Sequence, residues 1–587
     1  MRRLAIAAVL VATVGLVFGP VVGYGFVNWD DDLYITENPA VDPAQQPDSG
    51  LLLTRSLNYP VPVPIVAYRW VASVAGFDPG AFHLLNLVLH GINVLLVFLF
   101  LSRYLSVGRA AVGALLFAVH PIQAEAVAWC TSTKDLLAAG FTLASLTAND
   151  RALRGKGPPG RWLLLVVLTG ALAILSKPSA CVLPAALAVQ AALLGSRGTR
   201  VPPERAGAGD GFPQETLAAA EADSGYSKWH PRNLLAYGAL VGTAAFVAVM
   251  AVAWSVSSAA IHTSHFFTAS YFSGVLQAVA LQARHFLVPL DLQPFYVRWV
   301  GLPAFDVLHV TGVLVIAGLL VLAVVRFRNP DPRPRLFLAL FALFYLPVSG
   351  VVPIQRFIAD SYMYLPLVPL IALACVLVPE RWLQGTARRT TVVAAVVVLA
   401  VLLAFQAAHQ RSLWESSRTL WTPALEANPT SHVVFRHYAQ AWSGPSGIER
   451  PVAVTPELVE TTIREGAMDS IMVGWFAQLL PADRALALFL RQVAAGPVDL
   501  DLHRNFVTFV ALRRPSLDAT GLDLLGVAAT ALADDGLRKG DVGMLPALAR
   551  LLATHGLGSV ALPWLEDAGR RTGDPQFDNL ARSLRDP

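Results

Sequence analysis

Long apolar runs alternate with short polar connections along the first two thirds of the chain. The first run, Leu4 to Val22, has nineteen residues and no charge. A membrane-spanning helix needs about 20 apolar residues, and eleven runs approach this length. They cover residues 4–22, 84–101, 110–128, 135–149, 162–176, 180–195, 234–257, 306–325, 336–353, 364–379 and 390–408. The pattern predicts an all-α, polytopic membrane protein with about eleven transmembrane helices.

Basic residues fall in every second connection between these runs, among them Arg2, Arg3, Arg103, Arg109, Arg326 and Arg328. Because Lys and Arg collect in cytoplasmic loops, this register places the N-terminus and the connection 196–233 in the cytoplasm. It places on the extracytoplasmic face the first loop, 23–83, the segment 258–305 and everything after Gln410. The richness in Ala, Leu, Val and Arg favours a bacterial source, so the predicted location is a bacterial cytoplasmic (inner) membrane.

The tail of the chain has a different, amphipathic pattern. Apolar residues recur at helical spacing in short stretches, such as 484–496 and 542–558, and breaks fall at Pro, Gly and Asp. The first pair of stretches resembles a tetratricopeptide unit, with Trp421, Leu425, Pro429 and Tyr438 in the corresponding places. We expect a transmembrane domain over residues 1–408 and an extracytoplasmic, TPR-like helical-repeat domain over 409–587. Such a solenoid commonly binds peptides; the alternative is a cap that only stabilises the membrane domain.

Composition agrees with a membrane protein and excludes several other classes. Hydrophobic residues make up 55% of the chain and charged residues 14%, whereas a soluble domain carries roughly 25% charged residues. The net charge of +4 is explained by basic cytoplasmic loops rather than by nucleic-acid binding. The sequence has no Walker loop, no GxGxxG and no Cys/His cluster with metal spacing. His262 and His265 in HTSH have a possible metal-ligand spacing, but no acidic partner accompanies them in sequence.

Three adjacent aspartates, Asp30, Asp31 and Asp32, follow the first apolar run, between Trp29 and Leu33. One interpretation is an Asx-rich turn whose side chains cap a following helix. The other is catalytic: a carboxylate can accept the proton of a hydroxyl while that hydroxyl attacks an activated sugar carbon. Adjacent carboxylates repel, so one can have a raised pKa while another orients the acceptor or binds a cation. The aromatic neighbours and the outer-loop position favour the functional interpretation.

Further polar residues gather near the outer ends of the apolar runs. Ionisable groups at membrane depth cost about 2.5–3.5 kcal/mol each on insertion scales and are usually kept for a pathway, a site or a helix contact. If basic side chains converge there, they suit a phosphate group; the alternative is that each snorkels to the headgroups. The basic candidates are Lys134, Lys177 and Arg356. The other site candidates are Trp29, Asp32, His83, His90, His120, Glu125, Asp360 and Tyr362. Taken singly, His83 and His90 are expected to be interhelical hydrogen-bonding residues.

Six stretches occur in a particular order: NWDDDLYITENP, HLLNLVLHGIN, AVHPIQAEAVAWCTSTKDLLAA, HFLVPLDLQPFY, IADSYMYLPLVPL and TLWTPALEANP. This set resembles bacterial relatives of the transmembrane and tetratricopeptide-repeat O-mannosyltransferases, which belong to the GT-C glycosyltransferase superfamily. The resemblance covers roughly residues 1–440. It implies a polytopic enzyme that uses a polyprenyl-phosphate-linked sugar as donor and carries its catalytic acidic residue in the first outer loop.

The resemblance also implies roles for individual residues. By motif match the base is Asp30 or Asp31, with Asp32 a weaker candidate, and Lys177 and Arg356 match basic positions suited to the donor phosphate. The family often has a basic residue where Thr133 stands in this chain, beside Lys134, so the resemblance leaves open which of the two meets phosphate. It points to a metal-independent branch, and we expect no metal and no cofactor.

The sequence therefore predicts an integral-membrane transferase of mannose or a similar hexose. The acceptor is expected to be a protein hydroxyl, bound with the help of the helical-repeat domain. The nearest alternative is a GT-C enzyme that modifies a glycan or lipid. A lipid-linked-glycan transporter or flippase predicts ionisable groups near the bilayer midplane and an inverted repeat. A non-catalytic scaffold predicts no cavity beside the acidic run.

Overall fold

The computed structural model describes the chain except for residues 46–60, 155–158, 196–268, 297–306, 328–330, 352–355, 383, 445–446, 451, 465–467, 496–499 and 586–587. The chain forms two compact units, Met1–Leu420 and Trp421–Pro587.

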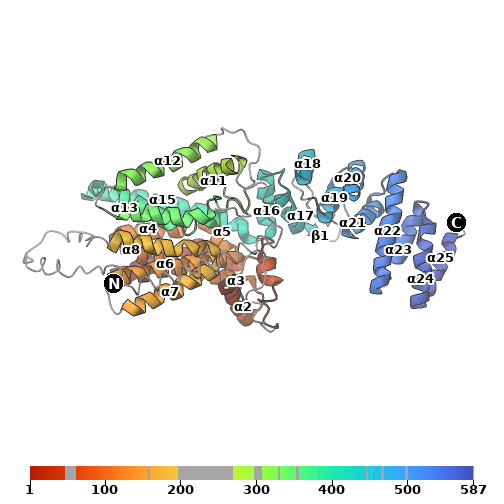
Figure 1. Ribbon diagram of the computed structural model, residues 1–587, viewed down its shortest axis with the longest axis horizontal. Coiled ribbons are helices and arrows are strands. Elements are labelled where there is room, and N and C mark those ends of the chain that lie inside the picture. The colour runs from red at the N-terminus through yellow and green to blue at the C-terminus, as the bar shows by residue number, and fades with distance from the viewer. Residues whose placement is uncertain are drawn as a thin grey trace, which may run out of the picture. The chain divides into compact units, whose positions relative to one another are not determined.

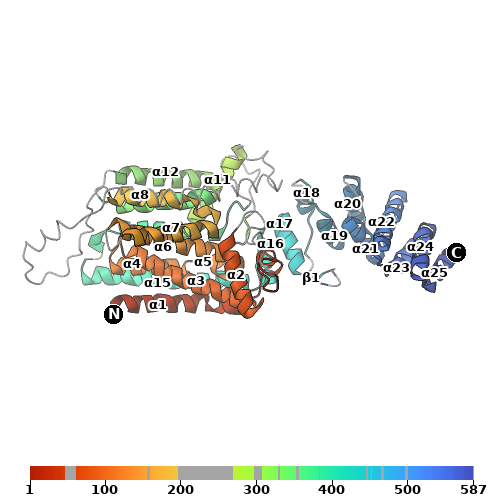
Figure 2. The ribbon, with the colours of Figure 1, turned by 60° about the horizontal axis from the view of Figure 1, so that its bottom comes forward.

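The first unit is helical, and most of its helices lie alongside one another (Figures 1 and 2). The helices are α1 (Arg2–Phe18), α2 (Pro62–Ala75), α3 (Pro79–Leu101), α4 (Val107–Val119), α5 (Gln123–Ala128), α6 (Thr133–Leu153), α7 (Pro159–Ser176), α8 (Leu183–Gly195), α11 (Ala269–Leu287), α12 (Val307–Phe327), α13 (Arg333–Tyr345), α14 (Leu367–Leu377) and α15 (Thr386–Ser412). A large apolar core joins α1, α3, α4, α6, α8, α13 and α14.

Four helices in the described part of the chain are long and apolar enough to cross a membrane: Arg2–Gly23, Pro79–Leu101, Val307–Arg326 and Thr386–Glu415. They correspond to the predicted runs 4–22, 84–101, 306–325 and 390–408. The apolar stretches of the last two are only 11% buried, so these helices offer most of their surface to lipid. Shorter helices cover most of the remaining runs, whereas the run 234–257 and the connection 196–233 lie outside the described residues. The total of eleven spans stays a prediction.

The helices differ from the predicted apolar runs in two places. The run 110–128 is two helices, because Pro121 forces His120 into an extended conformation (φ −68°, ψ 128°) and α4 ends at Val119. The segment 258–305, predicted as an outer connection, contains α11. This helix is hard to see in the sequence because Gln277, Gln282 and Arg284 interrupt its apolar pattern.

Polar contacts connect the ends of these helices. At the end of α6 that carries Leu153, the buried Asp150 carboxylate accepts two hydrogen bonds from Arg154 at 2.9 Å and lies 3.4 Å from Arg103. About 15 residues of helix, roughly 22 Å, separate Asp150 from Asp135 at the opposite end of α6. We call that opposite end, where the three aspartates lie, the acidic end of the unit.

The second unit is a series of short helices. They are the end of α16 (Ser417–Ala427), then α17 (His432–Ala441), α18 (Pro456–Arg464), α19 (Ser470–Leu479), α20 (Ala482–Ala495), α21 (Leu500–Arg513), α22 (Ala519–Lys539), α23 (Leu545–Thr554), α24 (Leu562–Thr572) and α25 (Pro575–Arg585), with two-residue strands β1 (Ser443–Gly444) and β2 (Gly447–Ile448). The helices predicted at 484–496 and 542–558 correspond to α20 and α23. Trp421 and Tyr438 are both buried, as the repeat pattern requires, but assignment to the tetratricopeptide class stays a prediction.

Candidate active site at the acidic turn

The three aspartates lie in a tight turn, which we call the acidic turn, residues 28–36. Asp30 has a positive φ of 69°, a conformation that is uncommon outside glycine but enriched in Asp and Asn. The Tyr34 amide donates to the Asp30 carbonyl at 2.9 Å, and a short helical turn follows over Asp32–Thr36. Residues held in sparsely populated backbone conformations cluster at functional sites. This backbone gives the neighbouring carboxylates of Asp30 and Asp31 different surroundings.

Asp31 is fixed by hydrogen bonds and is 1% exposed. One carboxylate oxygen accepts from the Thr131 amide at 3.0 Å and from the Thr131 hydroxyl at 2.6 Å, and the other accepts from the Val27 amide at 3.0 Å. Burial raises the pKa of Asp31 to about 7, against the opposing effect of these hydrogen bonds. A carboxylate with three protein donors and no exposure is suited to holding the turn in place rather than to meeting a substrate.

Asp30 has the opposite environment. It is half-buried, and no described residue hydrogen-bonds its carboxylate. Burial raises the pKa of Asp30, while the charges of Lys134 and Arg356 lower it and that of Asp32 raises it. Asp32 is half-exposed, and its carboxylate accepts from the adjacent Leu33 amide. Among the three aspartates, Asp30 therefore has an available carboxylate beside positive charge.

Lys134 lies in the first turn of α6, next to Asp30. Its ammonium is 4.4 Å from the centre of the Tyr34 ring and 5.2 Å from that of Trp129, close enough for cation–π attraction to both. The residue is 7% exposed, and within the described part of the chain no carboxylate forms an ion pair with it. Thr133, by contrast, donates its hydroxyl to Asn86 and to the Cys130 carbonyl. Of these two neighbours, Lys134 is the one placed to meet an anion.

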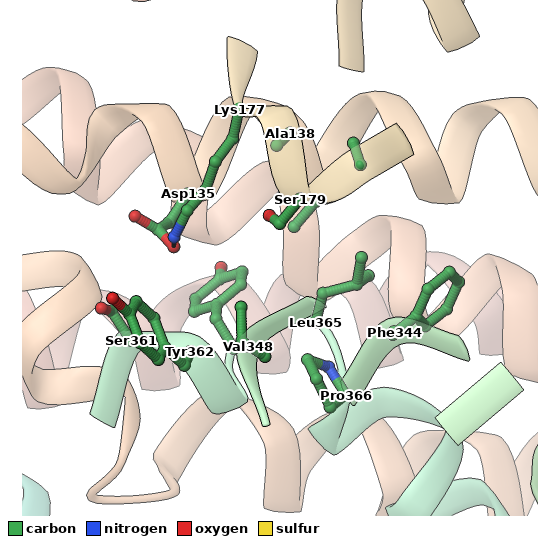
Figure 3. Close-up of a pocket in the computed structure, with 13 residues that line it drawn as sticks. Asp135, Ala138, Lys177, Ser179, Phe344, Val348, Ser361, Tyr362, Leu365 and Pro366 are labelled. Atoms are coloured by element: carbon green, nitrogen blue, oxygen red, sulfur yellow. Dashed lines mark hydrogen bonds and ion pairs between the residues drawn. The ribbon is translucent and has the colours of Figure 1, made fainter. Parts of the chain in front are cut away.

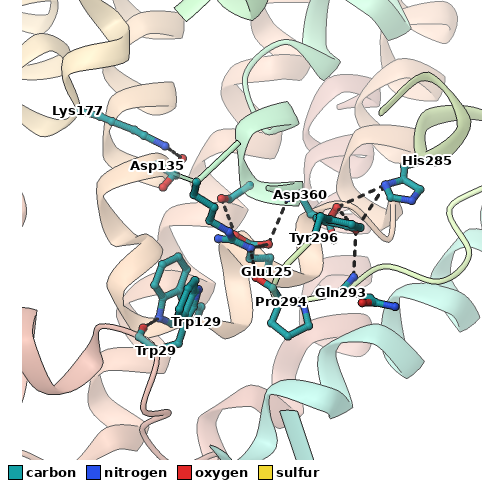
Figure 4. A network of polar contacts seen from close by, with 12 residues as sticks. Trp29, Glu125, Trp129, Asp135, Lys177, His285, Gln293, Pro294, Tyr296 and Asp360 are labelled. Carbon is teal, nitrogen blue, oxygen red and sulfur yellow. Dashed lines mark hydrogen bonds and ion pairs between the residues drawn. The ribbon is translucent and has the colours of Figure 1, made fainter. Parts of the chain in front are cut away.

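Arg356 and Glu125 form a largely buried ion pair at the acidic end. Figure 4 shows Glu125 in the network of polar contacts there, near Pro294 and Asp360. The guanidinium donates to the two Glu125 oxygens at 2.6 and 3.0 Å, and it also donates to the Pro294 carbonyl. Glu125 further accepts from the Asp360 amide at 3.2 Å and the Ser361 hydroxyl at 2.8 Å. Arg356, predicted as a phosphate ligand, thus already has a carboxylate partner.

Lys177 is also paired. Its ammonium contacts the Asp135 carboxylate and lies 5.0 Å from the centre of the Tyr362 ring. Both charged groups line a pocket (Figure 3). The remaining walls are mainly apolar and include Ala138, Ala139, Phe344, Val348 and Leu365. The polar residues Ser179, Ser361 and Tyr362 also line the pocket. Lys177, predicted as a phosphate ligand, thus already has a carboxylate partner.

The three predicted histidines are hydrogen-bonded within the helix packing and do not converge on Asp30. His83 contacts the Gly25 carbonyl at 3.2 Å, and His90 contacts the Tyr364 hydroxyl at 2.8 Å. His120 lies 3.1 Å from the Phe286 carbonyl and stacks on that ring. His90 also contacts the Ala118 carbonyl of α4 at 3.3 Å, which is an interhelical contact, whereas Gly25 lies outside the helices. His262 and His265 lie outside the described residues.

Several residues that complete the site were not singled out from the sequence. Trp129 stacks on Trp29 with ring centres 6.4 Å apart and donates to the Trp29 carbonyl at 2.7 Å. Tyr296 donates to Asp360 at 2.8 Å, beside His285. Thr131 holds Asp31. The stretch CTSTKD gave no sign of this role for Thr131, because a threonine that donates to a carboxylate far away in sequence has the same local pattern as any other loop threonine.

The acidic residues that the structure describes do not form a metal-binding cluster. Within the described ranges, no three His, Cys, Asp or Glu side chains lie in an arrangement that could hold a metal ion. The expectation that none is needed stays a prediction.

Comparison with known proteins identifies relatives of part of the chain. Residues 60–203 match the family described as dolichyl-phosphate-mannose-protein mannosyltransferase. Protein O-mannosyl-transferase TMTC4 from Homo sapiens is 39% identical over 121 residues, covering 17% of this chain and 16% of that protein. Protein O-mannosyl-transferase TMTC1 from Mus musculus is 30% identical over 192 residues, covering 29% of this chain and 20% of that protein.

The chain is related to the protein O-mannosyl-transferases. The resemblance seen in the ordered motifs is thereby confirmed, although the matches span only about a fifth of the relatives' length or less. The family match includes Glu125, Lys134 and Lys177, and it leaves the acidic turn outside. Among solved structures, the chain is similar to the Archaeoglobus fulgidus oligosaccharyltransferase, with 14% sequence identity and a TM-score of 0.40. This match covers 77% of this chain and 60% of the oligosaccharyltransferase chain.

The buried Asp31 predicts a pH dependence of stability. Its pKa in the folded protein, about 7, lies above the ordinary value of about 3.9, so the folded state holds this proton more tightly than the unfolded state. Asp31 therefore contributes stability that falls as pH rises from about 4 to 7. We expect the Asp31→Asn variant, measured by thermal unfolding in detergent between pH 5 and 8, to show a shallower decline than wild type. An unchanged decline would contradict the assignment.

Proposed function

We propose that the protein is an integral-membrane glycosyltransferase that moves a sugar from a polyprenyl-phosphate donor to an acceptor hydroxyl, with Asp30 as general base. The observation that carries this proposal is the contrast within the acidic turn. Asp31 is saturated by hydrogen bonds, whereas Asp30 has an available carboxylate next to Lys134 and Arg356. A base must reach the proton that it removes, and Asp30 satisfies this condition better than Asp31.

The proposed step is a single displacement. Asp30 takes the acceptor proton as the hydroxyl oxygen forms a bond to the anomeric carbon. The bond between that carbon and the phosphate oxygen breaks, and polyprenyl phosphate leaves with the electron pair. Positive charge near the leaving group stabilises the transition state because negative charge develops there.

Lys134 is the proposed donor-phosphate ligand. It is the basic site candidate that lies beside Asp30 without a carboxylate partner among the described residues, while Lys177 and Arg356 are paired. It also lies in the first turn of the 21-residue helix α6, and a helix N-terminus attracts anions.

The names of the relatives support a mannose or similar hexose and a protein acceptor. The proposed location is the extracytoplasmic face of a bacterial inner membrane, with the helical-repeat unit helping to hold the acceptor. The nearest rival, transfer to a glycan or lipid, uses the same base and is separated by the identity of the labelled product.

The contacts at the far end of α6 weigh against a flippase. A pathway across the membrane needs polar groups along the bundle that can open at both ends. Asp150, Arg154 and Arg103 instead form a buried network that holds α6 to the end of α3.

Separate replacement of Asp30 and Asp31 in the acidic turn tests the proposal. We expect Asp30→Asn to lower transfer about 100- to 10,000-fold, the usual contribution of a general base, with little change in thermal stability. The measurement is transfer of radiolabelled mannose from polyprenyl-phosphate mannose to protein in isolated membranes. Asp31→Asn serves as the matched control: it is expected to lower stability and to retain measurable transfer. Full activity in Asp30→Asn would overturn the proposal.

The charges around Asp30 predict opposite shifts in the pH profile. Activity requires ionised Asp30, so it falls on the acid side as Asp30 takes up a proton. Lys134 lowers the pKa of Asp30 and Asp32 raises it. We call the pH range in which activity is lost on acidification the acid limb of the pH profile. We therefore expect the acid limb to move to higher pH in Lys134→Met and to lower pH in Asp32→Asn, with Lys134→Arg close to wild type. Shifts of both variants in one direction would contradict the assignment of Asp30.

A further inference from the structure

Arg356 connects three separate parts of the acidic end. Through Glu125 it is tied to α5, through the Pro294 carbonyl to the segment after α11, and through its ring contacts to Trp29 and Trp129. The guanidinium carbon is 5.4 Å from the centre of the Trp29 ring and 5.9 Å from that of Trp129. Both distances fall within the range of cation–π attraction.

Glu125 fixes the orientation of this guanidinium. Four donors reach its carboxylate: two from Arg356, one from the Asp360 amide and one from the Ser361 hydroxyl. A bidentate Arg–carboxylate pair sets the plane of the guanidinium as well as its position. Because Glu125 is itself buried and fully bonded, Arg356 has little freedom to turn toward a bound phosphate.

Trp29 transmits this constraint to the acidic turn. It directly precedes Asp30, whose backbone has the uncommon positive φ of 69°. The Trp129 indole donates to the Trp29 carbonyl at 2.7 Å, and the Phe295 ring packs edge-on against the Trp29 ring. Trp29, the residue directly before Asp30, is thus held by contacts with Arg356, Trp129 and Phe295.

We propose that Glu125 and Arg356 are a positioning pair: Glu125 holds the Arg356 guanidinium against Trp29 and Trp129, and this contact places the Asp30 carboxylate for proton removal. Arg356 does not contact the donor phosphate. The inference rests on the proposed function and replaces the phosphate role predicted for Arg356. The sequence predicted one role, phosphate binding, for Lys134, Lys177 and Arg356; here Lys134 binds the leaving group and Arg356 orients the base.

The charge of Arg356 provides a readout that a merely structural pair would not affect. Asp30 senses Lys134 from α6, Arg356 from the segment before Asp360, and the neighbouring Asp32, while Asp31 and Tyr362 also interact with it electrostatically. Removing the Arg356 charge leaves Lys134 as the main positive neighbour of Asp30. The acid limb of activity then moves to higher pH.

The experiment compares Arg356→Gln with Arg356→Lys in the full-length protein, using polyprenyl-phosphate mannose as donor. Both variants lose the planar, bidentate contact, so we expect kcat to fall about 10- to 100-fold, as small misplacements of catalytic groups do. Only Arg356→Gln loses the charge, so only this variant should shift the acid limb upward. The KM for the donor should change less than about twofold in both.

Controls distinguish the possible failures. Arg154→Gln breaks the buried pair with Asp150 at the far end of α6 and should lower stability without moving the pH profile. Glu125→Gln keeps the arginine, so it should lower kcat without moving the acid limb to higher pH. This variant replaces Arg356→Gln in the test if Arg356→Gln does not fold. A large rise in donor KM with an unmoved acid limb would overturn the positioning pair in favour of a phosphate ligand. An active Asp30→Asn variant would contradict the proposed function itself.

Discussion

The buried contact between Asp31 and Thr131 joins the acidic turn to the start of α6, and the rest of the candidate site depends on it. Two residues 100 positions apart in sequence are held by an amide and a hydroxyl that donate to one carboxylate oxygen. Removing such an acceptor would leave buried donors unsatisfied, at about 1–3 kcal/mol each. Because Lys134 lies three residues after Thr131 and Asp30 directly precedes Asp31, this contact fixes the distance between the proposed base and the proposed phosphate ligand.

Charge compensation then divides the acidic end into structural and available groups. In a poorly solvated region an isolated charge is costly, and pairing Arg356 with Glu125 and Lys177 with Asp135 reduces this cost. Lys134 is stabilised differently, by the faces of Tyr34 and Trp129. Aromatic rings attract a cation without pairing it with an anion, so no ion pair with a described carboxylate has to break when an anion reaches Lys134. This difference explains why three basic residues that look equivalent in the sequence have different proposed roles.

The sequence predicts the helical class well because apolar periodicity over about 20 residues leaves few alternatives. It fails at α11, where buried polar side chains interrupt the pattern, and at Pro121, where a backbone restriction divides one apolar run. For the site, motif order narrowed the base to Asp30 or Asp31 but did not separate them. Their separation depends on the positive φ of Asp30 and on Thr131, which are properties of the folded chain. Likewise, the partners of Arg356 lie 62 and 231 residues away, a separation that no local pattern reports.

In the proposed mechanism, Asp30 and Lys134 lie on opposite sides of the bond that breaks. The most direct measurement is a cryo-electron microscopy structure of the full-length protein with an unreactive polyprenyl-phosphonate sugar analogue bound. We predict the phosphonate within hydrogen-bonding distance of the Lys134 ammonium, the anomeric carbon facing Asp30, and Arg356 still bonded to Glu125. A phosphonate bound to Arg356 in place of Glu125, or a sugar remote from Asp30, would contradict the account.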